Sequence, residues 1–243
     1  MGHSEMMCGR ATLSTSPEEL RDVFGLAETP TLTPRYNIAP SQPIAVVRAC
    51  AGPRRVELLR WGLVPSWARD LKTGSQRRQM INARVESLTE RPAFREALAR
   101  RRALVLVDGF YEWERRGRVR QPFFIQRRDT RPFALAGLWD RWVSPSGEAI
   151  ESCAIVTRPA TPPCDALHDR MPLVLPRASW DVWLDALVTE VARLEPLLRS
   201  ANDVTDDDDD AALVLRQVST RVNRPDVDDA TCIEPAVPEL TLF

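Results

Sequence analysis

The strongest strand signal in this chain is the stretch ALVLVDGFYEW at residues 103–113. Aliphatic and aromatic residues crowd this stretch, and such a composition is typical of a strand buried in a sheet. Similar apolar runs occur on both sides of it, and the helical patterns lie between or after these runs. Strands grouped in this way predict an α+β fold with a mainly antiparallel, barrel-like β core and peripheral helices, because βαβ units would alternate regularly.

The elements around this stretch follow from local signals. Ser16 is a helix N-cap with Pro17 in the first turn and Glu19 three residues after the cap, so a helix is expected as far as Gly25. Further helices are expected at residues 92–102, 179–187 and 190–198, the first with Phe94, Ala97 and Leu98 facing inward. Further strands are expected at residues 43–48, 56–61, 123–127, 133–139, 152–158, 213–218 and 232–233.

The length of 243 residues allows one large domain with a substantial core. No linker divides the chain, so residues 7–243 are predicted to form a single domain. Residues 1–6 lack the apolar segment of a signal peptide, and we interpret them as an N-terminal extension, a mis-assigned start or a cloning remnant. No apolar run is long enough to span a bilayer, so we expect a cytoplasmic protein that is monomeric and has no membrane partner.

Charge is distributed unevenly along the chain. The formal net charge is −1, but Asp206–Asp210 concentrates five negative charges in one surface loop, and the remainder has a net charge of +4. Every basic residue except Lys72 is arginine, a side chain suited to bidentate contacts with phosphate. The small net charge therefore does not exclude a nucleic-acid partner.

Cysteine and histidine usage limits the chemistry. Five scattered cysteines, with no Cys-x-x-Cys pair, argue against a disulfide framework. The only histidines are His3 and His168, so no zinc site is predicted and no metal or other cofactor is expected. Catalysis would then depend on ordinary side chains.

Cys8 stands out because it lies close to the start of the chain, in the sequence MCGR at residues 7–10. If the chain were trimmed after Met7, this residue would carry a free thiol and a free α-amine. The amine, with a pKa of about 7.7–8.0, can form an imine with an aldehyde, and the thiol can then close a thiazolidine ring. The alternative is a small buried hydrophobe, which describes most free cysteines.

Polar residues interrupt the apolar pattern at several further places. Residues 35–42 contain Asn37, Pro40 and Ser41, and form either a ligand-binding loop or a plain turn. Residues 61–67 contain Trp61 and Trp67, whose rings either stack on unpaired bases or cap the core.

Three more stretches carry candidate catalytic side chains. In a strand over residues 81–87, Asn82, Arg84 and Glu86 would share one face, which is either a site or an exposed surface. Glu112 follows an apolar strand, where partial desolvation would raise the pKa of its carboxyl group and suit it to proton transfer; a salt bridge is the alternative. His168 precedes Asp169-Arg170 on a predicted loop and is either catalytic or structural.

Taken together and in this order, the motifs resemble those of the SRAP (SOS response-associated peptidase-like) family. They are CGR (8–10), YNIAP (36–40), WGLVPSW (61–67), NARVE (82–86), DGFYEW (108–113) and HDRMP (168–172). The similarity extends from residue 7 to residue 235. It implies a single α+β domain with a barrel-like core that binds single-stranded DNA and captures abasic sites covalently, and it implies association with the nucleoid when the protein is bound to DNA.

The resemblance also implies a role for each matching residue. Cys8 would be the nucleophile that forms the thiazolidine, Asn82 would hydrogen-bond the sugar, Glu112 would position the amine and move protons, and His168 would act as acid or base on the opened sugar. Phosphates would be contacted by Arg10, Arg84 and Arg170. The DNA path would be lined by Asn37, Pro40, Ser41, Trp61 and Trp67.

The residues before Cys8 bear directly on this activity. While they are attached, Cys8 has an amide nitrogen and no thiazolidine can form. Either translation begins at Met7 and the initiator is removed, or the chain is cut autoproteolytically. We predict that a chain retaining Met1–Met7 binds DNA but does not crosslink to it.

Two other functions are compatible with the same residues. The first is a cysteine peptidase that uses Cys8 and His168, oriented by Glu112 or Asn82 and acting on its own N-terminus. The second is a non-covalent single-strand DNA-binding module, with steep salt dependence and no requirement for Cys8. A lysine-type lyase is disfavoured because Lys72 is the sole lysine and lies in a polar loop.

Overall fold

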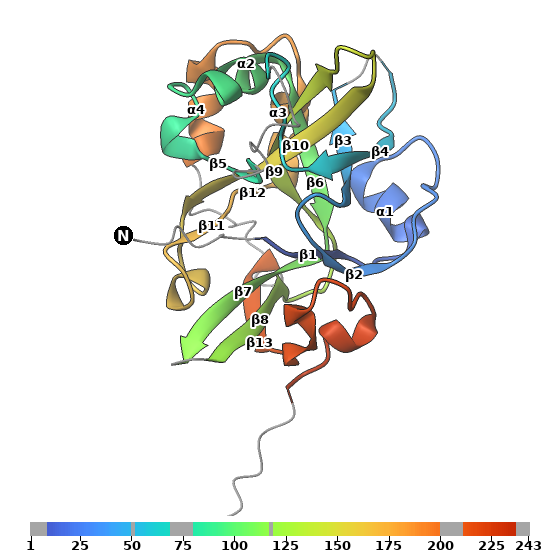
Figure 1. Ribbon diagram of the computed structural model, residues 1–243, viewed down its shortest axis with the longest axis vertical. Coiled ribbons are helices and arrows are strands. Elements are labelled where there is room, and N and C mark those ends of the chain that lie inside the picture. The colour runs from blue at the N-terminus through green and yellow to red at the C-terminus, as the bar shows by residue number, and fades with distance from the viewer. Residues whose placement is uncertain (1–8, 50–51, 69–79, 117–118, 200–210, 237–243) are drawn as a thin grey trace, which may run out of the picture.

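The computed structural model describes residues 9–49, 52–68, 80–116, 119–199 and 211–236 (Figure 1). The strands are β1 (Ala11–Leu13), β2 (Arg35–Ile38), β3 (Pro43–Arg48), β4 (Val56–Trp61), β5 (Asn82–Arg84), β6 (Arg102–Val107), β7 (Gly109–Arg116), β8 (Val119–Arg127), β9 (Phe133–Val143), β10 (Ala149–Pro159), β11 (Arg170–Pro172), β12 (Val174–Leu175) and β13 (Leu213–Gln217). The α-helices are α1 (Pro17–Phe24), α2 (Pro92–Arg100), α3 (Trp180–Leu184) and α4 (Val191–Arg199). Short 3₁₀ helices are η2 (Val85–Ser87), η3 (Cys164–Ala166), η4 (Arg177–Ser179), η6 (Thr220–Asn223) and η7 (Ala230–Cys232).

Five strands close into a barrel. β4, β3, β6, β9 and β10 pair antiparallel in that order, and β10 returns to β4 in parallel, with Arg60 opposite Ser152 and Trp61 opposite Cys153. Strands β11, β12 and β5 extend this sheet, and β5 also runs parallel to β10. The predicted α+β fold with a mainly antiparallel, barrel-like core is confirmed.

A second sheet leaves the barrel at the end of β6. Its strand order is β13-β8-β7-β1-β2, and it lies below the barrel in Figure 1, opposite helices α2 and α4. Strand β1 is therefore an interior strand of this sheet, between β7 and β2. This position brings the N-terminal part of the chain alongside the strand that carries Glu112.

The stretch 103–113 was predicted as one strand and is two, because the chain turns from one sheet to the other at Asp108 and Gly109. The Asp108 carboxylate accepts hydrogen bonds from the amides and hydroxyls of Ser14 and Thr15, at 2.5–3.1 Å. A Cβ on Gly109 would lie 2.2 Å from a ring carbon of Phe124, so only glycine fits this corner.

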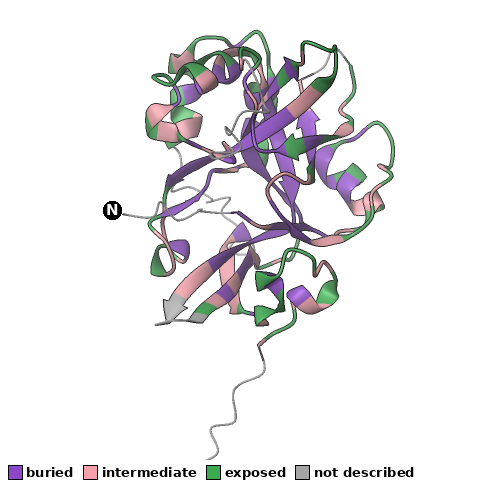
Figure 2. Cartoon of the chain, in the orientation of Figure 1, coloured by how far each residue is buried: buried purple, intermediate pink, exposed green. Residues whose placement is uncertain are grey.

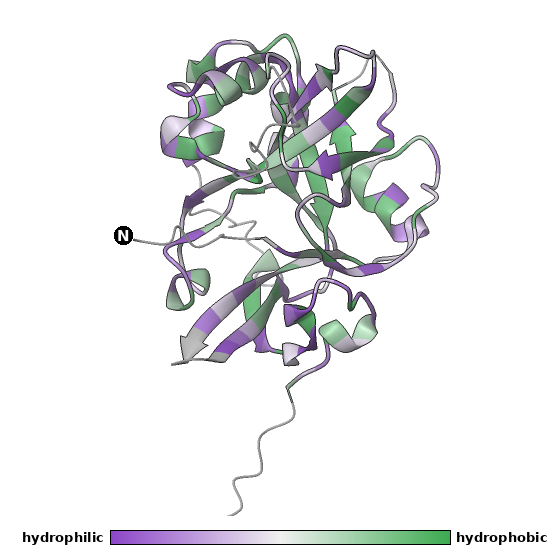
Figure 3. Ribbon diagram, viewed as in Figure 1, coloured by the Kyte–Doolittle hydropathy of each residue, from purple (hydrophilic) through white to green (hydrophobic). Residues whose placement is uncertain are grey.

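The hydrophobic core fills the barrel and continues under its helices. Strands β3, β6 and the middle of β10 are almost entirely buried in Figure 2 and apolar in Figure 3. A smaller cluster packs the C-terminal segment against the second sheet and contains Tyr111, Phe124, Val218, Val222 and Cys232. The molecule thus has two apolar centres with the sheet corner between them.

Helices α1, α2 and α4 begin close to the predicted residues, whereas the helix predicted at residues 179–187 is shorter, because α3 spans only Trp180–Leu184. The Ser16 hydroxyl accepts the Glu19 amide at 3.3 Å, and Gly25 ends α1 in the left-handed conformation. Helix α2 buries the expected face, but it stops at Arg100, and Arg102 begins β6. Arg102 is buried and donates to four main-chain carbonyls at the ends of α2 and α3, those of Leu98, Ala99, Trp183 and Asp185.

Two further expectations were wrong in detail. Residues 232–233 are not a strand, since Cys232 ends the 3₁₀ helix η7. Residues 81–87 are not one strand either: β5 stops at Arg84, and η2 turns Glu86 away from the face shared by Asn82 and Arg84. Within the described residues, no helix is long and apolar enough to cross a membrane.

Candidate functional site

Cys8 lies outside the described residues, as do Lys72 and Asp206–Asp210. The structure therefore describes the surroundings of the predicted nucleophile from Gly9 onward. Gly9 is buried and leads directly into β1. The site is accordingly built from the residues that face this end of β1.

Strand register brings the start of β1 to Glu112. Ala11 pairs with Phe110 and Thr12 with Gly109 in antiparallel β7, and the Tyr111 amide donates to the Arg10 carbonyl at 3.1 Å. In an antiparallel pair each step along one strand is a step back along the other, so the chain before β1 runs alongside β7 in the direction of Glu112. The Glu112 side chain is 3% exposed, which makes it a shielded carboxyl group in β7.

Glu112 also lies near the loop that carries His168. The pKa of the buried Cys164 thiol is raised to about 12, mainly by burial and then by the negative charge of Glu112. Glu112 is therefore one of the charged groups that act on η3. The Cys164 carbonyl accepts the His168 amide at 3.2 Å, which links η3 to the histidine.

His168 occupies the predicted loop, half-buried between η3 and β11. Its Nδ1 accepts the Arg170 amide at 3.0 Å, and the exposed Asp169 carboxylate lies 2.8 Å from the same nitrogen. The orientation of the ring is therefore set at Nδ1 by its own loop.

Asn82 begins β5. This strand runs parallel to β10 with Asn82 opposite Ile155, and the preceding residue, Ile81, accepts the Trp61 indole N–H through its carbonyl at 3.0 Å. Asn82 is half-buried, and Arg84, two residues further on the same face, is exposed. The face predicted for these two residues therefore exists, without Glu86.

Arg170 was predicted to contact phosphate, but its guanidinium is committed inside the protein. It forms a two-pronged ion pair with Glu86, with Nη2 at 2.9 Å from Oε2, and Nη2 also donates to the Thr157 carbonyl at 2.8 Å. Arg170 is buried, and the hydrogen bond that it donates to the Glu86 carboxylate lowers the pKa of Glu86. The two residues link β11 to η2 beneath the His168 loop.

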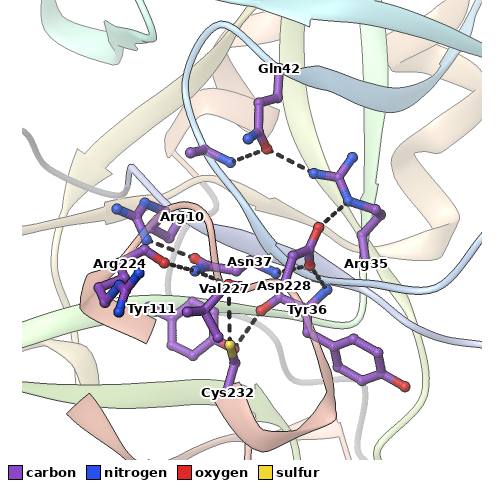
Figure 4. A network of polar contacts seen from close by, with 11 residues as sticks. Arg10, Arg35, Tyr36, Asn37, Gln42, Tyr111, Arg224, Val227, Asp228 and Cys232 are labelled. Carbon is purple, nitrogen blue, oxygen red and sulfur yellow. Dashed lines mark hydrogen bonds and ion pairs between the residues drawn. The ribbon is translucent and has the colours of Figure 1, made fainter. Parts of the chain in front are cut away.

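Asn37 was predicted to line the DNA path, and its fully buried side chain instead fastens the C-terminal segment to β2. Its Nδ2 donates to the carbonyls of Arg224 and Val227 at 2.9 and 2.6 Å, and its Oδ1 accepts from Arg10 Nη1 at 2.7 Å (Figure 4). Nδ2 also donates to the Val222 carbonyl at 3.2 Å. Because its side chain is fully buried, Asn37 is not available to contact a DNA strand.

The two tryptophans of residues 61–67 have opposite environments. Trp61 is completely buried, so the prediction that it lines the DNA path was wrong and its ring caps the core. Trp67 is 61% exposed. Its loop is fixed by hydrogen bonds from Val64 to the Ser152 hydroxyl at 2.8 Å and from Ser66 to Asp140 at 2.9 Å. An exposed indole is therefore presented on an anchored loop.

The remaining predicted DNA contacts lie beside this loop. Pro40 and Ser41 are half-buried in a turn after β2, and the Ser41 amide donates to the Trp61 carbonyl at 2.7 Å. Ser41 has a φ of 73°, an uncommon conformation for a residue other than glycine. The turn is therefore held against the strand that leads to Trp67.

Sequence reasoning missed Arg158, which lies on β10 opposite Met171. Its side chain is nearly buried, and its pKa is lowered by burial and by the positive charge of Arg170. The positive charge of Arg158 opposes, in smaller measure, the rise in the pKa of the Cys164 thiol. The signal in the sequence that could have indicated Arg158 was an arginine at the end of the apolar run 152–158.

Two cavities, of about 570 and 530 Å³, lie elsewhere in the described structure. Both include Arg48, the first with residues of β4 and the second with residues 184–187 after α3. Neither is lined by a predicted site residue. Within the described part of the chain, no three His, Cys, Asp or Glu side chains are grouped to hold a metal ion.

Comparison with known proteins identifies the family. The family model described as SOS response associated peptidase (SRAP) matches residues 7–225. The chain belongs to this family, whose match begins one residue before Cys8.

The relatives agree with this assignment. The abasic site processing protein YoqW of Bacillus subtilis is 36% identical over 232 residues, which cover 94% of this chain and 99% of that protein. The abasic site processing protein HMCES of Gallus gallus is 28% identical over 270 residues, which cover 94% of this chain and 78% of that protein.

Solved structures share the architecture. A crystal structure of a Bordetella bronchiseptica protein superposes with a TM-score of 0.72 at 26% identity, covering 87% of this chain and all of that one (100%). A Bacteroides thetaiotaomicron protein gives a TM-score of 0.79 at 22% identity over 95% of this chain, a likeness of fold.

Proposed function

We propose that this protein captures abasic sites in single-stranded DNA through a thiazolidine formed by Cys8, once the residues before it are removed. The observation that carries the proposal is the register of β1 on β7, with Ala11 opposite Phe110 and Thr12 opposite Gly109, because it directs the chain before β1 toward the shielded Glu112. In this proposal the α-amine of a chain that starts at Cys8, about 3.8 Å of chain before Gly9, is the group on which Glu112 acts.

The chemistry needs a proton acceptor and a proton donor. Glu112 takes a proton from the α-ammonium group, which frees the amine to attack C1 of the ring-opened sugar. His168 donates a proton to the departing hydroxyl, so that an imine and one water molecule result. The thiol then adds to the imine carbon and its proton moves to the nitrogen. This closes the ring and removes the reactive C=N bond.

Asn82 supplies hydrogen bonds to the sugar hydroxyls from the neighbouring strand, and its half-buried position on β5 supports this role. The exposed Arg84 continues the same face and provides a phosphate contact. Trp67 offers its exposed ring to a base of the unpaired strand. The named activities of the relatives YoqW and HMCES support abasic sites as the lesion.

The test compares two forms of the protein with an oligonucleotide that contains one abasic site. We expect the form that begins at Cys8 to give a heat-resistant shift on a denaturing gel, and the form that retains Met1–Met7 to give none. Cys8→Ser, which keeps the amine but cannot close a thiazolidine, is the matched control. A stable adduct with Cys8→Ser, or with a chain proven by mass to be uncut, would contradict the proposal.

The same samples distinguish covalent capture of an abasic site from peptidase activity. If the longer chain loses seven residues on incubation without DNA, it cuts itself, and crosslinking should appear in step with the cut. Cleavage that continues on added peptides while no abasic adduct forms would instead favour a peptidase.

A further inference from the structure

The C-terminal segment of residues 218–233, here called the brace, crosses the second sheet and reaches β1 and β2 (Figure 1). It contains η6 and η7, and it packs Val218, Val222 and Cys232 onto Tyr111 and Phe124. The brace therefore lies on the same part of the sheet that receives the N-terminal strand.

Asn37 is the centre of the attachment. Its single amide group donates to three carbonyls of the brace, at 2.6–3.2 Å, and is fully buried while doing so. An amide NH₂ has only two protons, so at least one of these bonds is shared. Asp228 completes the attachment by accepting the amides of Tyr36 and Asn37 at 2.6 and 2.7 Å and by pairing with Arg35 (Figure 4).

Both the side chain and the main chain of Arg10 are held by hydrogen bonds. Its Nη1 donates to Asn37 Oδ1 at 2.7 Å and to the Val222 carbonyl of the brace at 2.6 Å, and its guanidinium lies 5.9 Å from the Trp113 ring centroid. Its own carbonyl accepts the Tyr111 amide at 3.1 Å. Main chain and side chain are both fixed, one residue before β1 begins.

We propose that Arg10 is a positioning residue, and that it acts with Asn37 and the brace to fix the direction in which the chain N-terminal to it leaves the sheet. This proposal rests on the proposed function, because the group being directed is the Cys8 aminothiol, two residues away. Arg10 thereby orients the nucleophile toward Glu112 and does not serve mainly as a phosphate contact.

The two roles for Arg10 predict different measurements. A phosphate contact adds to DNA affinity, and its loss reduces the slope of log K against log salt by about 0.7 for a single strand. A positioning residue leaves affinity and slope unchanged and lowers the rate of the chemical step. A displacement of about 1 Å at a reacting group can lower a rate roughly 100-fold.

The experiment uses proteins that begin at Cys8: the parent, Arg10→Ala, Asn37→Ala, the double variant, and Arg224→Ala as the matched control. Arg224 lies on the brace with its side chain 72% exposed, and only its carbonyl meets Asn37. Three quantities are measured below the melting temperature: affinity for a lesion-free strand across a salt series, the crosslinking rate at saturating abasic strand, and the rate of thiazolidine formation with free glyceraldehyde.

We expect Arg10→Ala and Asn37→Ala each to lower the crosslinking rate about 10- to 100-fold. The double variant should be within about two-fold of the slower single variant, because both remove one shared contact. DNA affinity and its salt slope should match the parent, the glyceraldehyde rate should fall together with the crosslinking rate because Glu112 assists both reactions, and Arg224→Ala should change nothing. A lower affinity and slope in Arg10→Ala alone, or crosslinking rates equal to the parent's, would overturn the proposal.

A separate measurement distinguishes failure of this inference from failure of the proposed function. If the parent forms no adduct, the proposed function fails, and hydrogen exchange at the Tyr111 amide then tests the positioning directly. Exchange should be faster in Asn37→Ala than in Arg224→Ala, since the Tyr111 amide donates to the Arg10 carbonyl. Equal exchange in the two variants would overturn the positioning role.

Discussion

Both carboxylate oxygens of Glu86 accept hydrogen bonds from the Arg170 guanidinium, which also donates to the Thr157 carbonyl. Three segments far apart in the chain meet in this contact: η2 after β5, the end of β10, and the start of β11. The Arg170 amide also donates to His168 Nδ1, so the same residue supports the loop histidine through its main chain. The pair thus joins the strand that carries Asn82 to the loop that carries His168.

The first prediction concerns the pH dependence of this pair. Arg170 lowers the pKa of Glu86, so the folded state favours the ionised carboxylate. The stabilisation is complete above the usual pKa range of glutamate, about 4.3, and is lost as pH falls through the lowered pKa of the folded state.

Glu86→Gln should therefore unfold more easily than the parent at neutral pH, by roughly 1 kcal/mol or less because Glu86 is exposed. The difference should shrink as pH falls below about 4. Urea unfolding at a series of pH values measures it. Curves for the two proteins that stay parallel down to acid pH would refute this account of the pair.

The second prediction concerns the corner between the two sheets. Gly109→Ala should destabilise the fold by about 1–3 kcal/mol, because the new methyl group collides with the Phe124 ring. Combining it with Phe124→Leu should destabilise less than the two single changes added together, since the smaller side chain makes room for the methyl. Denaturant midpoints of the four proteins in this cycle measure the effect, and strict additivity would show that the collision is not the cause.

Local signals in the chain were sufficient for some elements. Ser16 and Gly25 cap the two ends of α1, as the rules for helix termini predict. The buried face of α2 follows from the spacing of Phe94, Ala97 and Leu98. The barrel-like class followed from the grouping of apolar strands. Each of these features depends on residues close together in the sequence.

Other features depend on distant partners and were not predictable in this way. The corner at Asp108 is created by donors almost a hundred positions earlier, such as Thr15, 93 residues away. Asn37 resembles a solvent-facing turn residue, and only the brace, 185–190 positions later, shows that it is a buried clamp. Trp61 and Trp67 lie six positions apart, and the closure of β4 against β10, with Trp61 opposite Cys153, buries the first of them.

The third prediction concerns the thiols. Cys153 and Cys164 are buried, and burial raises the pKa of each thiol to about 12, so neither carries appreciable thiolate at neutral pH. Cys232 is buried as well, and its thiol donates to the Val227 carbonyl at 3.4 Å. All three should resist iodoacetamide in the folded protein and react on unfolding, as read by mass spectrometry of peptides. Rapid labelling of Cys164 in the native state would show that the wall of the site near Glu112 opens to solvent.

The last prediction separates the two tryptophans. Trp67→Ala removes an exposed ring from an anchored loop, so it should weaken binding to a lesion-free single strand by roughly 1–3 kcal/mol, about 5- to 150-fold, with little change in stability. Trp61→Ala should instead destabilise the fold by about 3–5 kcal/mol, because it empties a packed site and leaves the Ile81 carbonyl without its indole donor. Fluorescence titration with an unlabelled strand and thermal melts measure both quantities on the same samples. Trp61 ends β4 and Trp67 lies six positions later. A loss of DNA affinity in a well-folded Trp61 variant, with Trp67→Ala unaffected, would mean that the DNA path runs on the opposite side of β4.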